Sequence, residues 1–170
     1  MRRLILFRHA KTEARPAGVE DFDRMLVERG RADSVLMGGV IAAAGFAPEL
    51  AIVSPAARAR ETWELASPAF PGARCEFRPG LYEATPEEVF AELDEETARA
   101  QTVMVVGHNP SLQELAVNLL IESSGSATDI EKLSAGFPTA AAAVFEIDSA
   151  GRFGLEALFL AGAWRGADTG

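Results

Sequence analysis

The chain has 170 residues, of which 48% are hydrophobic and 24% charged, a composition typical of one ordinary globular domain. Its formal net charge of −9 argues against nucleic acid or an anionic membrane as a partner, because there is no excess of Lys and Arg to neutralise phosphates. The single cysteine, Cys75, excludes an internal disulfide and favours a reducing, cytoplasmic location. No apolar run approaches the roughly 20 residues of a membrane span, and the apolar run near the N-terminus is too short for a signal peptide.

The first predicted element is a buried strand over residues 4–7, where four apolar residues stand in a row. The strand ends at Arg8 and His9. Arginine is a permanently charged donor suited to phosphate, and histidine can act as a base, an acid, a nucleophile or a metal ligand. Thr12 either lines a site at this strand end or caps the following turn. The polar residues 13–24 are long enough to fold over that site.

A helix and a second buried strand are predicted next. Apolar residues at helical spacing predict a helix from about residue 23 to residue 45. Residues 50–53 predict a strand, after which Ser54 suits a helix N-cap and a proline takes the first helical position. Arg58 lies in the first turns of that helix, whereas Arg60 points elsewhere, so Arg58 is the preferred site residue.

The remainder of the chain alternates strands with helices. We expect a strand near 75–78, a helix from Thr85 to about 98, a strand over 102–107, a helix over 111–121, and closing strands over 140–147 and 153–160. The Ser/Gly-rich residues 122–129 predict a mobile loop, and the residues after about 161 a loosely held tail. The pattern indicates one α/β domain over residues 1–170, a three-layer sandwich whose mostly parallel central sheet is flanked by helices.

Two histidines, His9 and His108, are present in the chain, and each follows an apolar strand. Asn109 is the expected N-cap of the helix after His108. Because the carboxyl ends of parallel strands meet at one edge of a sheet, we expect Arg8, His9, Arg58 and His108 to share a pocket beside helix N-termini. Two guanidiniums and two imidazoles in such a place indicate a phosphate site.

That set of residues suits phosphoryl transfer. Arginines can hold the phosphoryl oxygens, a neutral imidazole can attack phosphorus, and the second imidazole can hold the remaining oxygens. Glu83 is the candidate acid for the leaving group; Glu87 and Glu88 are weaker candidates because acidic residues are common in a first helical turn. A metal site on the two histidines is not expected, because no third ligand is evident and the arginines repel a cation.

Three motifs, read together, resemble the histidine phosphatase superfamily with its phosphoglycerate-mutase-like fold: Arg8–Thr12, Ser54–Thr62 and Gly107–Pro110. The short chain, residues 23–30, residues 81–86 and Phe137–Thr139 are similar to the SixA-type branch of phosphohistidine phosphatases. The resemblance spans about residues 1–160. It implies that His9 is the phosphorylated nucleophile, that Arg8, Arg58 and His108 form the phosphate pocket, and that neither a metal nor an organic cofactor is used.

We therefore expect a phosphatase that acts through a covalent phosphohistidine at His9, with Thr12 and Asn109 as further phosphate-binding residues. The expected substrate is phosphohistidine on a protein. A small-molecule phosphomonoester hydrolase, which would depend more on Glu83, is the alternative within the same class. A phosphate-binding module without catalysis is the alternative from another class.

Overall fold

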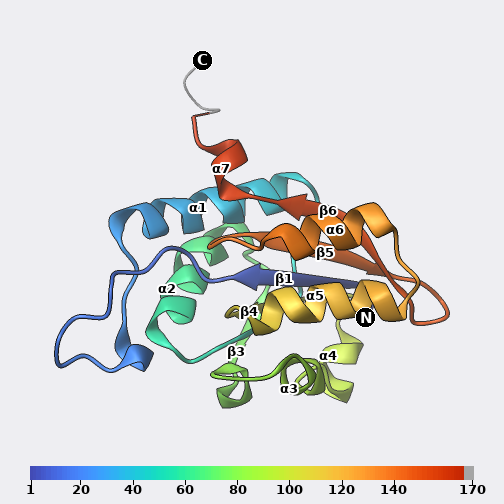
Figure 1. Cartoon of the computed structure of the whole chain (residues 1–170), viewed down its shortest axis with the longest axis horizontal. Coiled ribbons are helices and arrows are strands. Elements are labelled where there is room, and N and C mark those ends of the chain that lie inside the picture. Colours follow the sequence, from blue (N-terminus) through green and yellow to red (C-terminus); the bar gives the residue numbers. More distant parts are fainter. Residues whose placement is uncertain (167–170) are drawn as a thin grey trace.

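The computed structural model describes residues 1–166, apart from the side chain of Glu96. Its centre is a six-stranded sheet in the order β3-β2-β4-β1-β5-β6 (Figure 1). The strands are β1 (Arg3–Arg8), β2 (Leu50–Val53), β3 (Arg74–Phe77), β4 (Thr102–Gly107), β5 (Ala142–Ile147) and β6 (Phe153–Phe159). β1 to β4 are mutually parallel, β5 is antiparallel to β1, and β6 is antiparallel to β5. The predicted mostly parallel α/β fold is confirmed.

Helices cover both faces of the sheet (Figure 1). They are α1 (Glu28–Ala43), α2 (Ala57–Ala66), α3 (Pro86–Ala91), α4 (Glu95–Arg99), α5 (Ser111–Glu122), α6 (Ala127–Ala135) and α7 (Ala161–Trp164), with short 3-10 turns η1 (Asp21–Asp23), η2 (Ser67–Ala69) and η3 (Pro79–Leu81). One core cluster joins α1, α2 and α7 to the sheet, and the other joins α3, α5 and α6 to its opposite face. Within the described residues, no helix is long and apolar enough to cross a membrane.

β1 contributes to both cores because its side chains alternate between the two faces of the sheet. Leu4 and Leu6 pack in one cluster, Ile5 and Phe7 in the other, and all four are fully buried. A strand covered on both faces needs apolar residues at every position, which explains the uninterrupted run that precedes Arg8.

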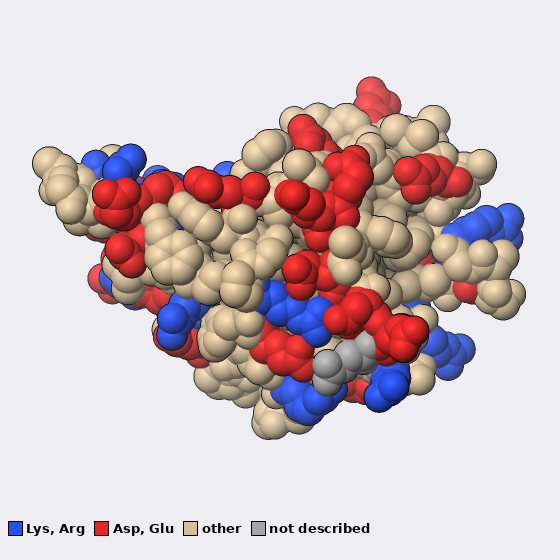
Figure 2. All heavy atoms as spheres, turned by 90° about the horizontal axis from the view of Figure 1, so that it is seen from below, with Lys and Arg blue, Asp and Glu red and all other residues tan. Residues whose placement is uncertain are grey.

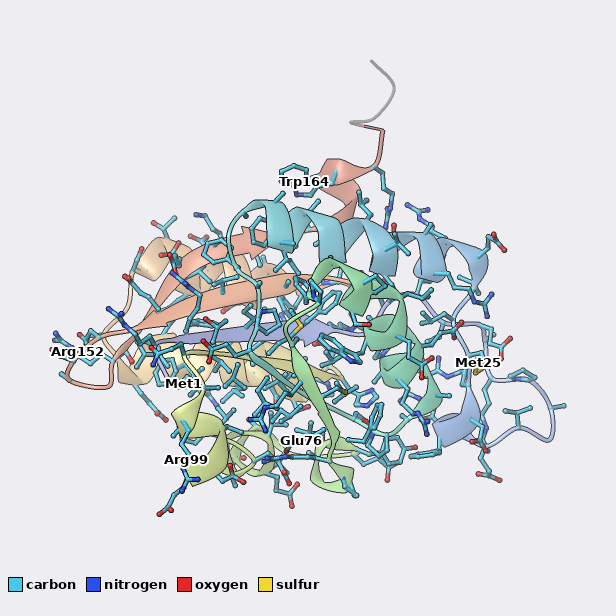
Figure 3. The ribbon with its side chains drawn as sticks, turned by 180° about the vertical axis from the view of Figure 1, so that it is seen from behind. Met1, Met25, Glu76, Arg99, Arg152 and Trp164 are labelled. Carbon is cyan, nitrogen blue, oxygen red and sulfur yellow. The ribbon has the colours of Figure 1, made fainter. Side chains whose placement is uncertain are left out.

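The residues that leave β1, β2 and β4 emerge side by side. Arg8 is paired with Gly107 across the sheet, and the His9 N–H donates to the Gly107 carbonyl at 3.0 Å. The Ser54 N–H donates to the Val106 carbonyl at 3.0 Å. In Figure 3, β1 runs toward the end of the molecule where Met25 lies. Met1 lies at the other end. The predicted meeting of strand ends is confirmed.

Two helix starts differ from the sequence prediction. α1 begins at Glu28 rather than near residue 23, because η1 and an isolated bridge between Thr12 and Leu26 fold the preceding residues against the strand end. α2 begins at Ala57, and the Ser54 side chain is not its N-cap. The Ser54 hydroxyl instead contacts His108, with its oxygen 2.7 Å from Nε2 of that ring.

Two other segments are more broken, or more ordered, than predicted. The single helix expected from Thr85 to about residue 98 is divided into α3 and α4, although Thr85 and Glu88 form the capping box of α3. The prediction of a loop over 122–129 is wrong for its last residues, because α6 begins at Ala127 with the Ser126 hydroxyl as its N-cap. The sequence prediction contained no α6.

The predicted tail begins with α7, and Trp164 lies beside α1 in Figure 3. The Arg165 guanidinium then donates to both carboxylate oxygens of Asp33, at 2.8 and 2.6 Å. The final part of that tail, residues 167–170, lies outside the described residues.

Candidate active site

A pocket of about 270 Å³ opens at the edge where these strands end. It is lined by Arg58, Tyr82, Glu83, Ala84, His108, Asn109, Pro110 and Ser111. These residues come from the start of α2, the loop between η3 and α3, and the junction of β4 with α5. His9 lies against this group, with its ring centroid 5.2 Å from that of His108. The two histidines are therefore brought together, as predicted.

His9 is buried, and its ring has one nitrogen engaged by the backbone. Nδ1 lies 2.8 Å from the Ala10 carbonyl oxygen, so the neutral ring donates its Nδ1 proton there and leaves Nε2 unprotonated. Burial, followed by the charges of Arg58, Arg8 and Arg24, lowers the pKa of His9 to about 4. His9 is therefore neutral near pH 7, with a lone pair on Nε2.

Thr62 links the His9 strand end to α2. Its hydroxyl accepts a hydrogen bond from the Ala10 N–H at 3.0 Å and donates to the Arg58 carbonyl at 2.7 Å. Thr62 and Arg58 share a helix face at the i, i+4 spacing, so one turn of α2 holds both the backbone after His9 and the guanidinium beside it.

Three guanidinium groups surround His9, and each keeps its Nε without a partner. Arg8 donates from one terminal nitrogen to the Phe137 carbonyl at 2.9 Å. Arg24 donates from one terminal nitrogen to the Thr12 hydroxyl at 2.6 Å and from the other to Asp21 at 3.0 Å.

In the part of the chain that the structure describes, four buried nitrogens at this site lack a hydrogen-bond partner: Nε of Arg8, Arg24 and Arg58, and Nδ1 of His108. A buried polar group without a partner costs about 1–3 kcal/mol, so these four nitrogens are available to bind a group that enters the pocket.

His108 is also buried, but it is bound differently from His9. Its Nε2 lies 2.7 Å from the Ser54 hydroxyl oxygen. Its ring packs edge to face with the ring of Tyr82, with the two ring centroids 5.8 Å apart. Burial, followed by the charges of His9 and Arg58, lowers the pKa of His108 to about 3. Both imidazoles are therefore neutral over the physiological range of pH.

Asp21 belongs to the site although its sequence position does not predict it. Its Oδ2 accepts from Arg58 at 3.1 Å and from the Tyr82 hydroxyl at 3.1 Å, while its carbonyl accepts from Arg58 at 2.8 Å. Burial alone would raise the pKa of Asp21, but the charge of Arg58, the Tyr82 hydrogen bond and the charge of Arg24 together lower it. An ionised carboxylate therefore covers one side of the arginine pocket.

A signal for these residues was present in the sequence. Arg24 belongs to the segment 23–30 that resembles the SixA-type branch, but that resemblance gave it no role. Asp21 lies in the polar segment expected to fold over the site, and it forms part of η1. Only the three-dimensional contacts connect Asp21 with Arg58, 37 residues further along the chain.

Two predicted phosphate-binding residues are placed differently from the others. The Thr12 hydroxyl accepts from Arg24, so Thr12 orients that guanidinium. The Asn109 amide nitrogen donates to Gln113 at 3.2 Å and to the Phe137 carbonyl at 3.0 Å, which uses both of its protons. The Asn109 side chain thus has no N–H left for a phosphate oxygen, and it does not cap α5, whose N-cap is Pro110.

Glu83 supplies a carboxylate to the pocket lining. Its side chain is exposed, and its backbone has a φ of 54°, an uncommon conformation for a residue other than glycine. Glu88, by contrast, is committed to the capping box with Thr85. Among the three acidic candidates, Glu83 is the one that lines the pocket.

The arrangement suits a small tetrahedral anion. Guanidinium and imidazole nitrogens provide several donors, and a neutral imidazole lies beside them. No group of three His, Cys, Asp or Glu side chains that could hold a metal occurs among residues 1–166. The face seen from below in Figure 2 carries many Asp and Glu side chains, with Lys and Arg side chains among them.

Comparison with known proteins gives a consistent result. The model of the histidine phosphatase superfamily (branch 1) matches residues 4–101, which is more than half of the chain. The uncharacterized protein Rv1276c of Mycobacterium tuberculosis is 36% identical over 140 residues, covering 82% of this chain and 86% of that protein.

Solved structures agree with this assignment. A candidate phosphohistidine phosphatase SixA from Agrobacterium tumefaciens superposes with a TM-score of 0.82 at 31% identity, covering 94% of this chain and 97% of that one. A candidate phosphohistidine phosphatase SixA from Nakamurella multipartitia gives a TM-score of 0.81 at 25% identity, covering 94% and 95% of the two chains.

Proposed function

The chain belongs to the histidine phosphatase superfamily (branch 1), and we propose that it is a phosphatase that transfers the phosphoryl group of its substrate to Nε2 of His9 and then to water. The observation that carries this proposal is the state of His9. Its Nδ1 proton is committed to the Ala10 carbonyl, which leaves a lone pair on Nε2, and the ring lies near three arginines and His108, each with an unpartnered buried nitrogen.

In the first step the Nε2 lone pair of His9 attacks phosphorus while the bond from phosphorus to the leaving group breaks. The leaving atom keeps the bonding electrons and takes up a proton from Glu83 or from solvent water. Arg8 and Arg58 hold phosphoryl oxygens through the nitrogens of their guanidiniums, and His108 donates from Nδ1. These donors stabilise the charge on the equatorial oxygens of the transition state.

In the second step water attacks the phosphohistidine, the bond between phosphorus and Nε2 breaks, and inorganic phosphate leaves. The low pKa of His9 helps this step, because the imidazole then departs as a neutral group. The attacking water returns one proton to the donor of the first step, so each residue recovers its starting state and the cycle consumes only substrate and water.

We propose phosphohistidine on a protein as the substrate class. The likeness to the two SixA proteins supports this, since both are described as candidate phosphohistidine phosphatases. The chemistry supports it as well: an imidazole is a better leaving group than an alkoxide, so an acid on the leaving side is less necessary. The acidic candidate Glu83 is exposed to solvent, which suits such a reaction.

A second candidate is the hydrolysis of small phosphomonoesters. Glu83 favours it, because its carboxyl group lines the pocket together with Arg58 and His108 and, in its protonated form, can donate a proton to an alkoxide leaving group. A rival without catalysis, a phosphate-binding module, would have the same donors but no turnover.

Two substrates separate these possibilities. The protein is incubated with an aryl phosphate and with a histidine-phosphorylated protein, and phosphate release is measured for the wild type and for His9→Ala. Release by the wild type alone is the expected result, with the phosphohistidine protein preferred. No release from either substrate, or equal release by His9→Ala, would contradict the proposed function.

A further inference from the structure

Ser54 lies directly behind His108 and is completely buried. Its backbone N–H is bonded to the Val106 carbonyl, which fixes the residue to the end of β4. Its hydroxyl oxygen lies 2.7 Å from Nε2 of His108 and accepts a longer hydrogen bond from the Ala56 N–H at 3.4 Å. The side chain thus contacts the histidine ring from the side opposite its free nitrogen.

The hydroxyl proton of Ser54 decides which tautomer of His108 fits. Among the hydrogen bonds of the described residues, Nε2 of His108 is the only acceptor near enough for that proton. If Nε2 carried a proton itself, the buried Ser54 hydroxyl would have nothing to donate to. A buried donor without an acceptor is costly, so the geometry favours a lone pair on Nε2. The ring proton of neutral His108 is then on Nδ1.

We propose that Ser54 is a positioning residue that holds His108 in the tautomer with its proton on Nδ1. The tautomer of His108 is inferred from its contact with Ser54. The role of that tautomer in catalysis rests on the proposed function. Nδ1 of His108 is the buried ring nitrogen without a partner, so the proton is directed to the atom that is free to bind an oxygen.

The two histidines then share one tautomer but leave different ring nitrogens free, Nε2 in His9 and Nδ1 in His108. His9 donates its Nδ1 proton to the Ala10 carbonyl and keeps a lone pair on Nε2. His108 accepts from Ser54 at Nε2 and keeps a proton on Nδ1. A lone pair is what a nucleophile needs, and an N–H is what a phosphoryl oxygen needs. A wrong tautomer at His108 would turn a lone pair toward an anion instead.

The direct test is nuclear magnetic resonance of the protein with 15N-labelled histidine, near pH 7.5, without added ligand. With two histidines in the chain, every ring nitrogen is assignable by the variants His9→Asn and His108→Asn. The wild type is expected to show an Nδ1–H tautomer at both histidines. In Ser54→Ala, His108 is expected to lose its preference for Nδ1–H, while the His9 signals stay unchanged and report an intact fold.

The kinetic readout accompanies the spectroscopic one. Loss of a correctly placed donor to a transition-state oxygen commonly lowers kcat about 10²–10³-fold. Ser54→Ala keeps the His108 ring but no longer fixes its Nδ1–H tautomer, so kcat is expected to fall on the order of tenfold. KM should change less than kcat, and Ser54→Thr, which keeps the hydroxyl, should restore part of the loss. Ser34→Ala is the matched control, since Ser34 is equally buried but donates to the Gly30 carbonyl within α1.

A wild-type His108 with its proton on Nε2 would overturn the proposal. So would a Ser54→Ala variant that keeps the wild-type tautomer population. If the wild type shows the expected tautomers but releases no phosphate from any substrate, the proposed function fails and the role of Ser54 as a tautomer-fixing residue stands.

Discussion

The rings of His9 and His108 lie 5.2 Å apart, with their planes inclined by 56°, and neither carries a charge near pH 7. Two imidazolium ions could not share this space beside three arginines. Burial and the neighbouring guanidiniums therefore make both rings available in their neutral forms, one as an acceptor and one as a donor.

The first prediction concerns the titration of this pair. Since the pKa of His9 is lowered to about 4 and that of His108 to about 3, neither should take up a proton between about pH 8 and pH 5. The ring C–H signals of the two histidines should stay constant over this range in a proton titration. A midpoint near the ordinary histidine pKa of about 6.5 for either ring would contradict the buried, arginine-lined site.

The same lowered pKa values link folding to pH. In the unfolded chain both histidines take up protons near pH 6.5, above the pH at which the folded protein does so. Stability contributed by the neutral rings is therefore present above about pH 6.5 and is lost as the pH falls to about 4 for His9 and to about 3 for His108.

The second prediction concerns Asp21, whose carboxylate is bonded to both Arg58 and Arg24. A phosphate that enters must displace or repel this charge. Asp21→Asn should therefore bind inorganic phosphate about three- to fivefold more tightly, as expected for a partly exposed ion pair worth up to about 1 kcal/mol. Calorimetry or competitive inhibition measures the affinity.

Asp23→Asn is the control for this change. Asp23 lies in the same η1 turn, is exposed, and its loss alters the net charge equally. Phosphate affinity should change little in that variant. Weaker phosphate binding by Asp21→Asn would instead mean that the carboxylate is needed to hold Arg58 in place, and that its repulsion of the anion is the smaller effect.

The third prediction separates the two substrate classes. Glu83→Gln removes the carboxyl group that we propose as the leaving-group acid and keeps the side chain's size. Turnover of an alkyl phosphate should fall about 10²-fold or more, the usual contribution of a general acid. Turnover of a phosphohistidine protein should fall far less, because imidazole is a better leaving group. Equal losses on both substrates would argue against the preference for the bond between phosphorus and nitrogen.

The fourth prediction concerns stability rather than catalysis. Asp33 has a side chain only 3% exposed, and both of its oxygens are bonded by Arg165. Arg165→Ala leaves that carboxylate buried and unpaired, which should lower the free energy of unfolding by about 1–3 kcal/mol in denaturant titrations. Arg152→Ala breaks the exposed pair with Asp148 and should leave the free energy of unfolding nearly unchanged. Similar small losses of unfolding free energy in both variants would contradict the claim that the bond between Arg165 and Asp33 anchors the segment after α7.

The strands and the residues at their ends were predictable from local sequence because their signals are local. An unbroken apolar run that ends in Arg8 and His9 indicates a strand buried on both faces with polar groups at its edge. The same reasoning placed His108 at the neighbouring strand end. These inferences needed only the general rule that parallel strands direct their ends to one side.

What the sequence could not reveal depends on long-range contacts. Ser54 has the residue type and the sequence position of an N-cap, yet its hydroxyl contacts a histidine 54 residues away in the sequence. Asn109 has the same signal, yet its amide is used by Phe137 and Gln113. In both places a tertiary hydrogen bond outcompetes the local cap, because Asn and Ser can satisfy either. Helix α6 was missed for a different reason, since the Ser/Gly-rich residues before it mask its start.

If His9 carries the phosphoryl group during turnover, the phosphorylated protein can be trapped and the modified residue identified. The protein is mixed for milliseconds with a 32P-labelled aryl phosphate or phosphohistidine protein, denatured in alkali, and digested to find the labelled peptide. We expect an alkali-stable, acid-labile label on the peptide that contains His9, absent from His9→Ala and longer-lived when His108 is replaced by Ala. A turning-over enzyme with its label on any other residue, or with equal label in His9→Ala, would contradict the role of His9 as the nucleophile.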